Sequence, residues 1–170
     1  MPNWCANHLT LRHADPNMIA KVAEGWNKGE LFQTLVPMPE ELKGTTSPSD
    51  NTNHELIDKH GYDNWYDWCV NNWGTKWEAD ADSGDIAEQS EEEIVLVFDT
   101  AWSPPIELYV NLEEQGYDVK AYYFEPGMMF CGMYEDGDDD CLKIGVDEIP
   151  EELEDIFDII SWLDEPEDEE

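Results

Sequence analysis

Negative charge is concentrated in one half of this 170-residue chain. Residues 1–76 contain 10 acidic and 6 basic side chains, whereas residues 77–170 contain 32 acidic and 2 basic ones, so the halves carry net charges of −4 and −30. Repulsion within such a polyanion costs folding stability, and its field repels nucleic acids and anionic membranes while it attracts basic surfaces. A basic partner is therefore the first expectation.

The composition is nevertheless that of a folded domain. The chain is 41% hydrophobic with 8 Trp, 7 Tyr and 5 Phe, an aromatic content that acidic disordered tails lack. Its length predicts one domain, and only residues 164–170 are typical of a disordered acidic tail. No apolar run approaches the roughly 18 residues of a membrane span and the polar start is unlike a signal peptide, so we expect a cytoplasmic protein with no membrane contact. The 4 cysteines contain no close CxxC pair, which favours reduced thiols over disulfides.

Hydrophobic periodicity and turn residues predict the elements of the first half. They are a strand over residues 3–12, a helix from Asp15-Pro16 to near Gly29, an extended piece and turn over 31–42, a loop over 44–53, and helical spacings over 55–73 that break at Gly61.

The same signals predict alternating strands and helices in the second half. They are a strand entered at 77–82, a turn or exposed loop over 82–85, a buried strand over 94–98, a helix from Ser103-Pro104 to Gly116, a strand over 119–124 with its hairpin partner over 128–134, a charged turn over 136–140, a strand over 141–146 and a final helix over 150–163.

This order predicts an α+β fold with a ferredoxin-like antiparallel sheet backed by helices. Residues 1–134 are expected to form the ferredoxin-like domain, with a helical insertion at about 44–76. An acidic extension over residues 135–163, a hairpin and a helix, is expected to pack on the same domain. Two apolar-faced helices, after Asp15 and Ser103, need one sheet face to cover.

Four short strings go beyond periodicity. They are Met1-Pro2-Asn3-Trp4-Cys5 with Asn7, Asn72-Trp73-Gly74-Thr75-Lys76-Trp77, Thr100-Ala101-Trp102-Ser103-Pro104-Pro105, and Glu125-Pro126-Gly127 with Phe130 and Gly132. Together they resemble the YubB ferredoxin-like family, which occurs on phages, plasmids and related bacterial elements and has no established activity. The resemblance runs from Met1 to about Tyr134 and implies the fold and a mobile-element origin, with no catalytic residues to carry over. The acidic extension has no motif of this family.

The residues of these strings favour a structural role, because indoles offer large apolar surfaces and glycines permit tight backbone. A rival interpretation is an aromatic ligand site beside Lys76 and Asn72. The family-motif residues are Asn3, Trp4, Trp73, Gly74, Thr75, Lys76, Trp77, Trp102, Ser103, Pro104, Pro105, Gly127 and Gly132.

Metal ligation finds weak support. Cys5 with His8, and His54 with His60, are loose pairs of zinc-ligand types, but residues three apart on a strand point to opposite faces. The segment 80–84 places carboxylates as a calcium loop does, yet its glycine is one position early and no helices flank it. Neither a specific metal nor a cofactor is expected.

Catalysis finds little support either. With 42 carboxylates, paired acids occur at almost any spacing and carry no specificity. The sequence contains no GxSxG, phosphate loop or HExxH.

The acids after Tyr134 form the candidate partner-binding surface. In the expected final helix Leu153, Ile156, Phe157, Ile160 and Leu163 form a buried stripe, and Glu151, Glu154, Asp155 and Asp158 form a negative ridge on the opposite face. The full set of candidate partner-binding residues is Asp136, Asp138, Asp139, Asp140, Asp147, Glu148, Glu151, Glu152, Glu154, Asp155 and Asp158.

The charge density predicts a non-enzymatic DNA mimic that inhibits a basic, DNA-binding host protein of a restriction or CRISPR-type defence, acts in the host cytoplasm and does not bind nucleic acid itself. A halophile-type acidic binder of small ligands is a second hypothesis, although solvent adaptation should affect both halves equally. A metal-binding or enzymatic ferredoxin-like protein is a third. The sequence does not define the oligomeric state.

Overall fold

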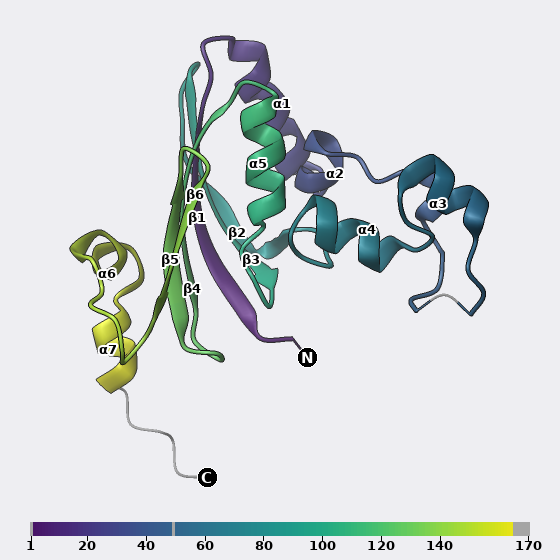
Figure 1. Ribbon diagram of the computed structural model, residues 1–170. Helices are drawn as coiled ribbons and strands as arrows, with labels where there is room; N and C mark the ends of the chain where they lie inside the picture. The colour runs from purple at the N-terminus through teal and green to yellow at the C-terminus, as the bar shows by residue number, and fades with distance from the viewer. Residues whose placement is uncertain (1, 49, 165–170) are drawn as a thin grey trace.

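The computed structural model describes residues 2–48 and 50–164. Its elements (Figure 1) are β1 (Trp4–Arg12), α1 (Pro16–Asn27), α2 (Leu31–Leu35), the 3-10 helix η1 (Glu40–Leu42), α3 (His54–His60), α4 (Trp65–Asn72), β2 (Asp80–Gln89), β3 (Glu93–Ala101), α5 (Ile106–Glu114), β4 (Asp118–Glu125), β5 (Phe130–Glu135), β6 (Asp138–Lys143), α6 (Glu151–Phe157) and α7 (Ile159–Asp164). None of these helices has the length and apolar character needed to cross a membrane. Apart from Asp164, the predicted tail lies outside the described residues.

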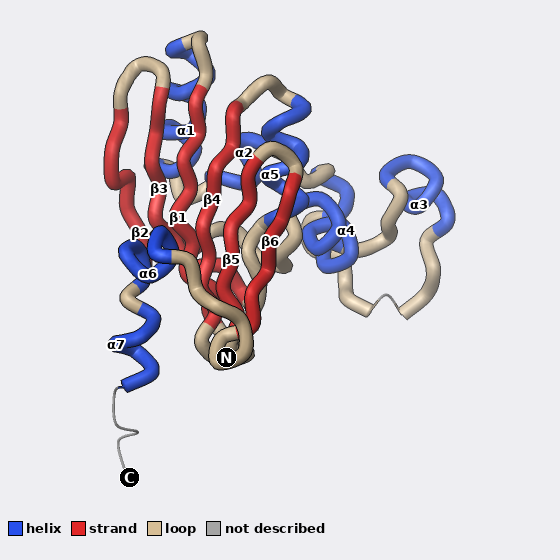
Figure 2. The backbone as a smooth tube through the Cα atoms, turned by 60° about the vertical axis from the view of Figure 1, so that its left-hand side comes forward, coloured by secondary structure: helices blue, strands red, loops and turns tan. Residues whose placement is uncertain are grey.

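One six-stranded sheet forms the centre of the molecule, in the order β2-β3-β1-β4-β5-β6 (Figure 2). Its neighbouring strands are all antiparallel. The central strand β1 pairs with β3 on one side and β4 on the other, and α1 and α5 connect the strands as in a split βαβ unit. The predicted ferredoxin-like fold is therefore confirmed.

The main core lies between the sheet and the helices α1, α2 and α5 (Figure 1). Residues alternate along β1, so that Leu9 and Leu11 point to this core and are fully buried. Asn7 also points there, and its side-chain amide donates to the Phe98 carbonyl (3.2 Å) and the Thr100 hydroxyl (2.9 Å). These bonds satisfy a polar group that burial would otherwise penalise.

The acidic extension covers part of the opposite sheet face. A second apolar cluster there joins Tyr122, Phe124 and Cys131 of the sheet to Leu153 of α6 and Ile159 of α7. The two small helices leave the upper part of β2, β3 and β1 uncovered on this face (Figure 2). We call this whole face of the sheet the outer face, and the face that carries the main core the helix side.

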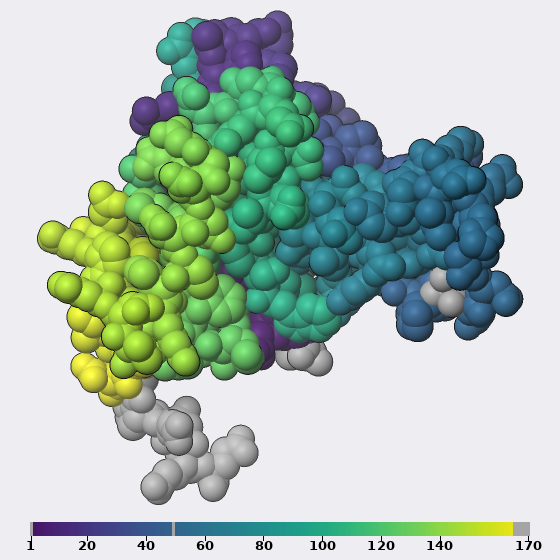
Figure 3. All heavy atoms as spheres, viewed as in Figure 1, coloured from purple at the N-terminus to yellow at the C-terminus, as the bar shows by residue number. Residues whose placement is uncertain are grey.

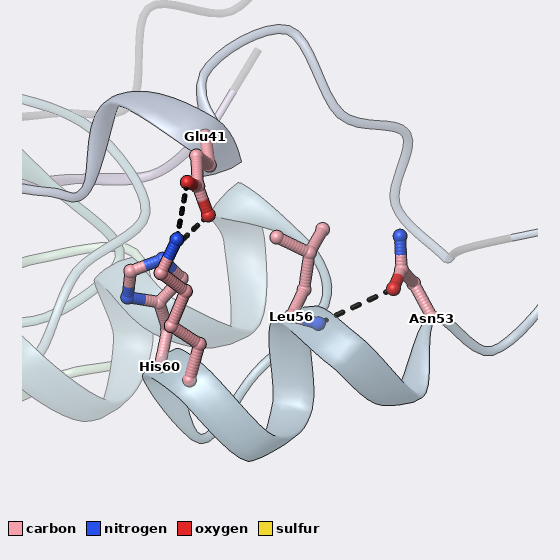
Figure 4. A network of polar contacts seen from close by, with 5 residues as sticks. Glu41, Asn53, Leu56 and His60 are labelled. Carbon is pink, nitrogen blue, oxygen red and sulfur yellow. Dashed lines mark hydrogen bonds and ion pairs between the residues drawn. The ribbon is translucent and has the colours of Figure 1, made fainter.

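The helices α3 and α4 form a lobe beside the sheet, and they match the helical spacings expected over residues 55–73 with their break at Gly61. Asn53 caps α3 by accepting from the Leu56 amide (3.2 Å), and Glu41 bridges η1 to the end of α3 (Figure 4). Its carboxylate accepts from the Lys59 amine (2.6 Å) and lies 3.0 Å from His60 Nε2. His60 is thus engaged within the lobe.

The extended piece predicted over residues 31–42 is wrong at its start, where α2 forms. The carboxylate of Glu78 accepts hydrogen bonds from the amides of Phe32 (2.7 Å) and Gln33 (3.0 Å), and so satisfies the free N–H groups at the start of this helix. Burial raises the pKa of Glu78 despite these donors. The cap comes from a distant part of the chain, which local periodicity does not reveal.

Two predicted turns are strands. Residues 82–85 lie within edge strand β2, where the register shifts between Asp80 and Asp85 as in a β-bulge. Asp138–Asp140 belong to β6, and the turn before them is confined to Asp136 and Gly137, whose φ angles are 50° and 81°. Two residues with positive φ form the tight hairpin connection that suits the twist of the strands.

The helix predicted from Ser103 starts later than expected. Its first residue is Ile106, and the Ser103 hydroxyl donates to the Gly74 carbonyl (2.8 Å) instead of capping the helix. The preceding Trp102 has a φ of 67°, so the backbone turns sharply before α5 begins.

The predicted final helix is wrong as a single helix. It breaks at Asp158, which has a φ of 52°, and the Glu154 carboxylate accepts from the amide of Ile160 at 3.0 and 3.1 Å. The break rotates the following side chains: Ile159 is buried, while Ile160 and Leu163 are 59% and 44% exposed. The predicted buried stripe and the negative ridge therefore both end at the break.

Candidate functional site

The predicted partner-binding acids belong to the segment coloured light green to yellow, which lies on one side of the molecule (Figure 3). They come from the β5–β6 turn, β6, the connection to α6, and α6 with its C-terminal residue. Ten of the eleven are exposed and Glu154 is half-buried. We call this set the acidic surface.

Strand alternation divides the acids of β6 between two faces. Asp138 and Asp140 point to the outer face, where they join Glu135 and Asp136 around a shallow hollow of about 240 Å³. Asp139 points to the helix side and accepts from the Tyr123 hydroxyl (2.6 Å). Glu135 was not among the sequence-predicted residues, although its position opposite Asp138 follows from the two-residue turn.

Several acids of this surface also hold the fold. Glu154 caps α7, Asp147 accepts from the Lys143 amide (2.7 Å), and Glu152 accepts from the Tyr122 hydroxyl (3.1 Å). Substitutions of these three would therefore disturb structure as well as charge. For the other acids of this surface apart from Asp139, the described residues show no hydrogen bond to the side-chain carboxylate. These acids are Asp136, Asp138, Asp140, Glu148, Glu151, Asp155 and Asp158.

Little positive charge compensates the acidic surface. Among the described residues after Lys76, the ion pairs join Glu93 to Arg12 and Glu135 to Lys120, the latter at 4.0 Å. Both involve acids outside the predicted partner-binding set. The negative field of the acidic surface is therefore available to attract a positively charged partner.

A larger hollow of about 630 Å³ lies on the outer face. Arg12 and Lys120 reach it beside acids such as Glu88 and Asp118, and half-buried His8 contributes its imidazole. His8 Nδ1 has no hydrogen-bond partner among the described residues, and burial lowers the pKa of this side chain. The hollow is thus a place where charges of both signs meet.

Part of the family-motif set gathers at the edge of the sheet where β1 begins. The Lys76 amine lies between two indoles, 4.0 Å from the Trp77 ring centroid and 3.9 Å from that of Trp102. The ring centroids of Trp4 and Trp77 lie 6.4 Å apart, and the Asn3 carbonyl accepts a hydrogen bond from the Trp102 backbone amide (2.8 Å). These contacts hold the lysine in a cation–π sandwich.

The motif residues differ in burial. Trp73 is buried and its indole donates to the Val36 carbonyl (2.8 Å), and Thr75, Pro104 and Pro105 are buried as well. In contrast, Trp77 and Trp102 are 41% and 45% exposed, so they are not core residues.

The three motif glycines lie where an added Cβ would come close to other atoms. A Cβ at Gly127 would lie 2.5 Å from Asn3 Cγ, and one at Gly132 would lie 2.3 Å from the Tyr123 hydroxyl. Gly74 has a φ of 87°, and its Cβ would lie 2.9 Å from the backbone nitrogen of Ile106.

Gly74→Ala is therefore expected to lower the free energy of unfolding by about 2–4 kcal/mol, because left-handed strain adds to a clash with rigid backbone. The matched control is Gly44→Ala, which has a φ of 79° but no atom near the added Cβ, so it should cost only about 1 kcal/mol. Denaturant unfolding measures both. Equal losses in the two variants would contradict the close contact with α5.

Of the pairs considered for metal binding, Cys5 and His8 lie on opposite faces of the sheet. Cys5 points to the main core and His8 to the outer face, and segment 80–84 lies in edge strand β2. Among the described residues, no three His, Cys, Asp or Glu side chains are grouped as metal ligands.

A family model described as "Ferredoxin-like domain in Api92-like protein" matches residues 72–161. The match covers β2 to α6 and most of the acidic extension, which the sequence-based resemblance had left out. Strand β1 lies outside the matched range, and in the sheet it stands between the matched strands β3 and β4. The crystal structure of protein api92 from Yersinia pseudotuberculosis is similar at a TM-score of 0.48 and 12% identity, covering 88% of this chain and 100% of that chain. No curated protein matches.

Proposed function

Since this chain belongs to the family of ferredoxin-like domains in Api92-like proteins, we propose that the shared scaffold carries a non-enzymatic DNA mimic. In this proposal the acidic surface occupies the nucleic-acid site of a basic, DNA-binding host protein of a restriction or CRISPR-type defence. The protein acts in the host cytoplasm and does not bind nucleic acid itself. The narrower YubB assignment, with its phage or plasmid origin, is part of the same proposal and is supported by the four strings.

The observation that carries the proposal is the density of uncompensated charge. A compact chain of this length has a diameter of about 40 Å, and the same length of duplex DNA carries about 24 phosphates. The net charge of −34 exceeds that number. A protein that grips phosphates with Lys and Arg therefore meets a comparable field.

The arrangement of β6 adds a geometric argument. Asp138 and Asp140 lie on the same face of the extended edge strand β6, about 6.8 Å apart along it because each residue rises about 3.4 Å. One strand of B-DNA carries one phosphate per about 3.4 Å of helix axis, so these two carboxylates are spaced about as far apart as every second phosphate. The exposed carboxylates of α6 add to the negative charge of the same extension.

The experiment that tests the proposal is competition. A salt-labile partner is first isolated from host lysate and identified, and its binding to this protein is then measured with and without duplex DNA. Mutually exclusive binding supports mimicry, whereas simultaneous binding with unchanged affinities contradicts it.

The hollow on the outer face favours a second candidate, a binder of small charged molecules. Arg12, Lys120 and the unpartnered His8 Nδ1 are the groups that such a ligand would contact. Binding here would raise the melting temperature of the parent and not of a Lys120→Ala variant, because a ligand that binds only the folded state stabilises it.

A further inference from the structure

A groove of about 330 Å³ lies on the helix side of the sheet, between the start of α5 and the strands β4 to β6. Pro104, Ile106 and Phe130 form apolar walls, and Glu107 and Asp139 place carboxylates beside them. The groove gathers residues from five separate parts of the chain and includes the motif residues Gly74, Ser103 and Pro104.

One carboxylate of the groove is held by a hydrogen bond from a tyrosine that reaches across three strands. Tyr123 of β4 extends over Gly132 of β5 and donates its hydroxyl hydrogen bond to Asp139 of β6 (2.6 Å). Tyr123 is buried, and a Cβ at Gly132 would lie 2.3 Å from its hydroxyl oxygen. Burial and the neighbouring Asp139 both raise the pKa of Tyr123, so the phenol stays a donor.

The tyrosine leaves part of the Asp139 carboxylate for other partners. Only Oδ1 accepts the described hydrogen bond, and Asp139 is exposed to solvent. Phe130 packs edge-on against Tyr123 with their ring centroids 6.1 Å apart, and is itself half-buried. A fixed carboxylate thus stands next to an aromatic and aliphatic wall.

This combination matches one kind of side chain. Lysine and arginine both bury an apolar stem and expose a charged head. The planar guanidinium also stacks on aromatic rings and pairs with carboxylates through two hydrogen bonds, whereas an ammonium is a compact, strongly hydrated point charge. Proteins that bind DNA present arginine to phosphates and bases.

We propose that the groove receives an arginine side chain of the basic partner, with its guanidinium on Asp139 and Glu107 and its stem against Phe130 and Ile106. The identity of this occupant rests on the proposed function, because charge complementarity to a DNA-binding protein selects it. The groove would then act as a specific anchor beside the diffuse attraction of the acidic surface.

The test uses the free protein and needs no partner. N-acetyl-argininamide is titrated into ¹⁵N-labelled protein at physiological ionic strength, and amide chemical shifts are followed. We expect saturable shifts confined to β4–β6 and the start of α5, and binding several-fold weaker for N-acetyl-lysinamide.

The decisive variant is Asp139→Asn, which keeps an oxygen acceptor for Tyr123 and removes the charge. It should weaken argininamide binding by about 5–10-fold, the loss of a charge-assisted pair. Asp155→Asn removes the same charge from exposed α6 and should leave binding unchanged.

Each other outcome overturns the inference. Shifts scattered over the acidic surface, equal binding of the lysine probe, or equal binding by Asp139→Asn would all show that the groove selects no guanidinium. DNA competition in the partner assay is a separate result, so failure of the groove and failure of mimicry are distinguishable.

Discussion

Raising NaCl from about 0.01 M to about 0.15 M is expected to raise the melting temperature by about 5–15 °C. The added salt shortens the Debye length from about 30 Å to about 8 Å. Two carboxylates about 10 Å apart in water repel by about 0.4 kcal/mol, and this screening removes roughly half of that. Ten to twenty such pairs, about the number that 32 acids in one half of the chain supply, correspond to about 2–4 kcal/mol and to the stated shift.

Thermal unfolding followed by circular dichroism measures this effect in buffer without divalent cations. KCl serves as the control, because screening by monovalent salts depends on ionic strength and not on the cation. A flat or falling melting temperature over this range would mean that the charges are compensated within the folded protein.

Charge reversal on the acidic surface is expected to weaken partner binding by about 100-fold, which is about 2.7 kcal/mol. Such changes at an interface mainly slow association and make binding less dependent on salt, because they remove electrostatic attraction that salt would otherwise screen. The variant changes acids that are exposed and whose side-chain carboxylates hold no hydrogen bond among the described residues, so that the fold is kept. Its substitutions are Asp138→Lys, Asp140→Lys, Glu151→Lys and Asp155→Lys.

A variant with the same change in net charge elsewhere is the control for this experiment. It reverses four exposed acids outside the acidic surface, namely Glu30→Lys, Glu55→Lys, Asp58→Lys and Glu114→Lys. Surface plasmon resonance gives association and dissociation rates for both. Similar losses in the two variants would indicate a response to net charge alone and would rule out a defined binding surface.

Local signals predicted most of the sheet and its two main helices. The alternation in β1, the apolar run in β3 and the Asp15-Pro16 start of α1 all match the structure, because each element buries one face and obeys its own period. The Asp136-Gly137 pair is also a strong hairpin signal. A two-residue turn at this pair predicts that the next strand of the hairpin begins at Asp138, where β6 does begin.

The remaining errors have long-range causes. The start of α2 is capped by Glu78, which follows the insertion in the chain, and no property of residues 31–35 reveals this acceptor. The break at Asp158 arises where Glu154 caps a second helix, so the helical pattern continued across a point where the backbone turns.

The candidate site was predictable only in part. The exposure of the acids followed from their charge, since carboxylates are rarely buried without partners. The groove beside Asp139 was not predictable, because Ile106, Tyr123 and Phe130 meet there only once the strands and α5 are assembled. The exposure of Trp77 and Trp102 depends on the same assembly.

Competition with DNA tests mimicry most directly. The identified partner is immobilised, saturated with this protein at physiological ionic strength, and challenged with increasing concentrations of a duplex that the partner binds. The account predicts that the duplex displaces this protein in proportion to its own occupancy, and that excess protein displaces the duplex in return. A ternary complex in which both are bound with unchanged affinities would contradict it.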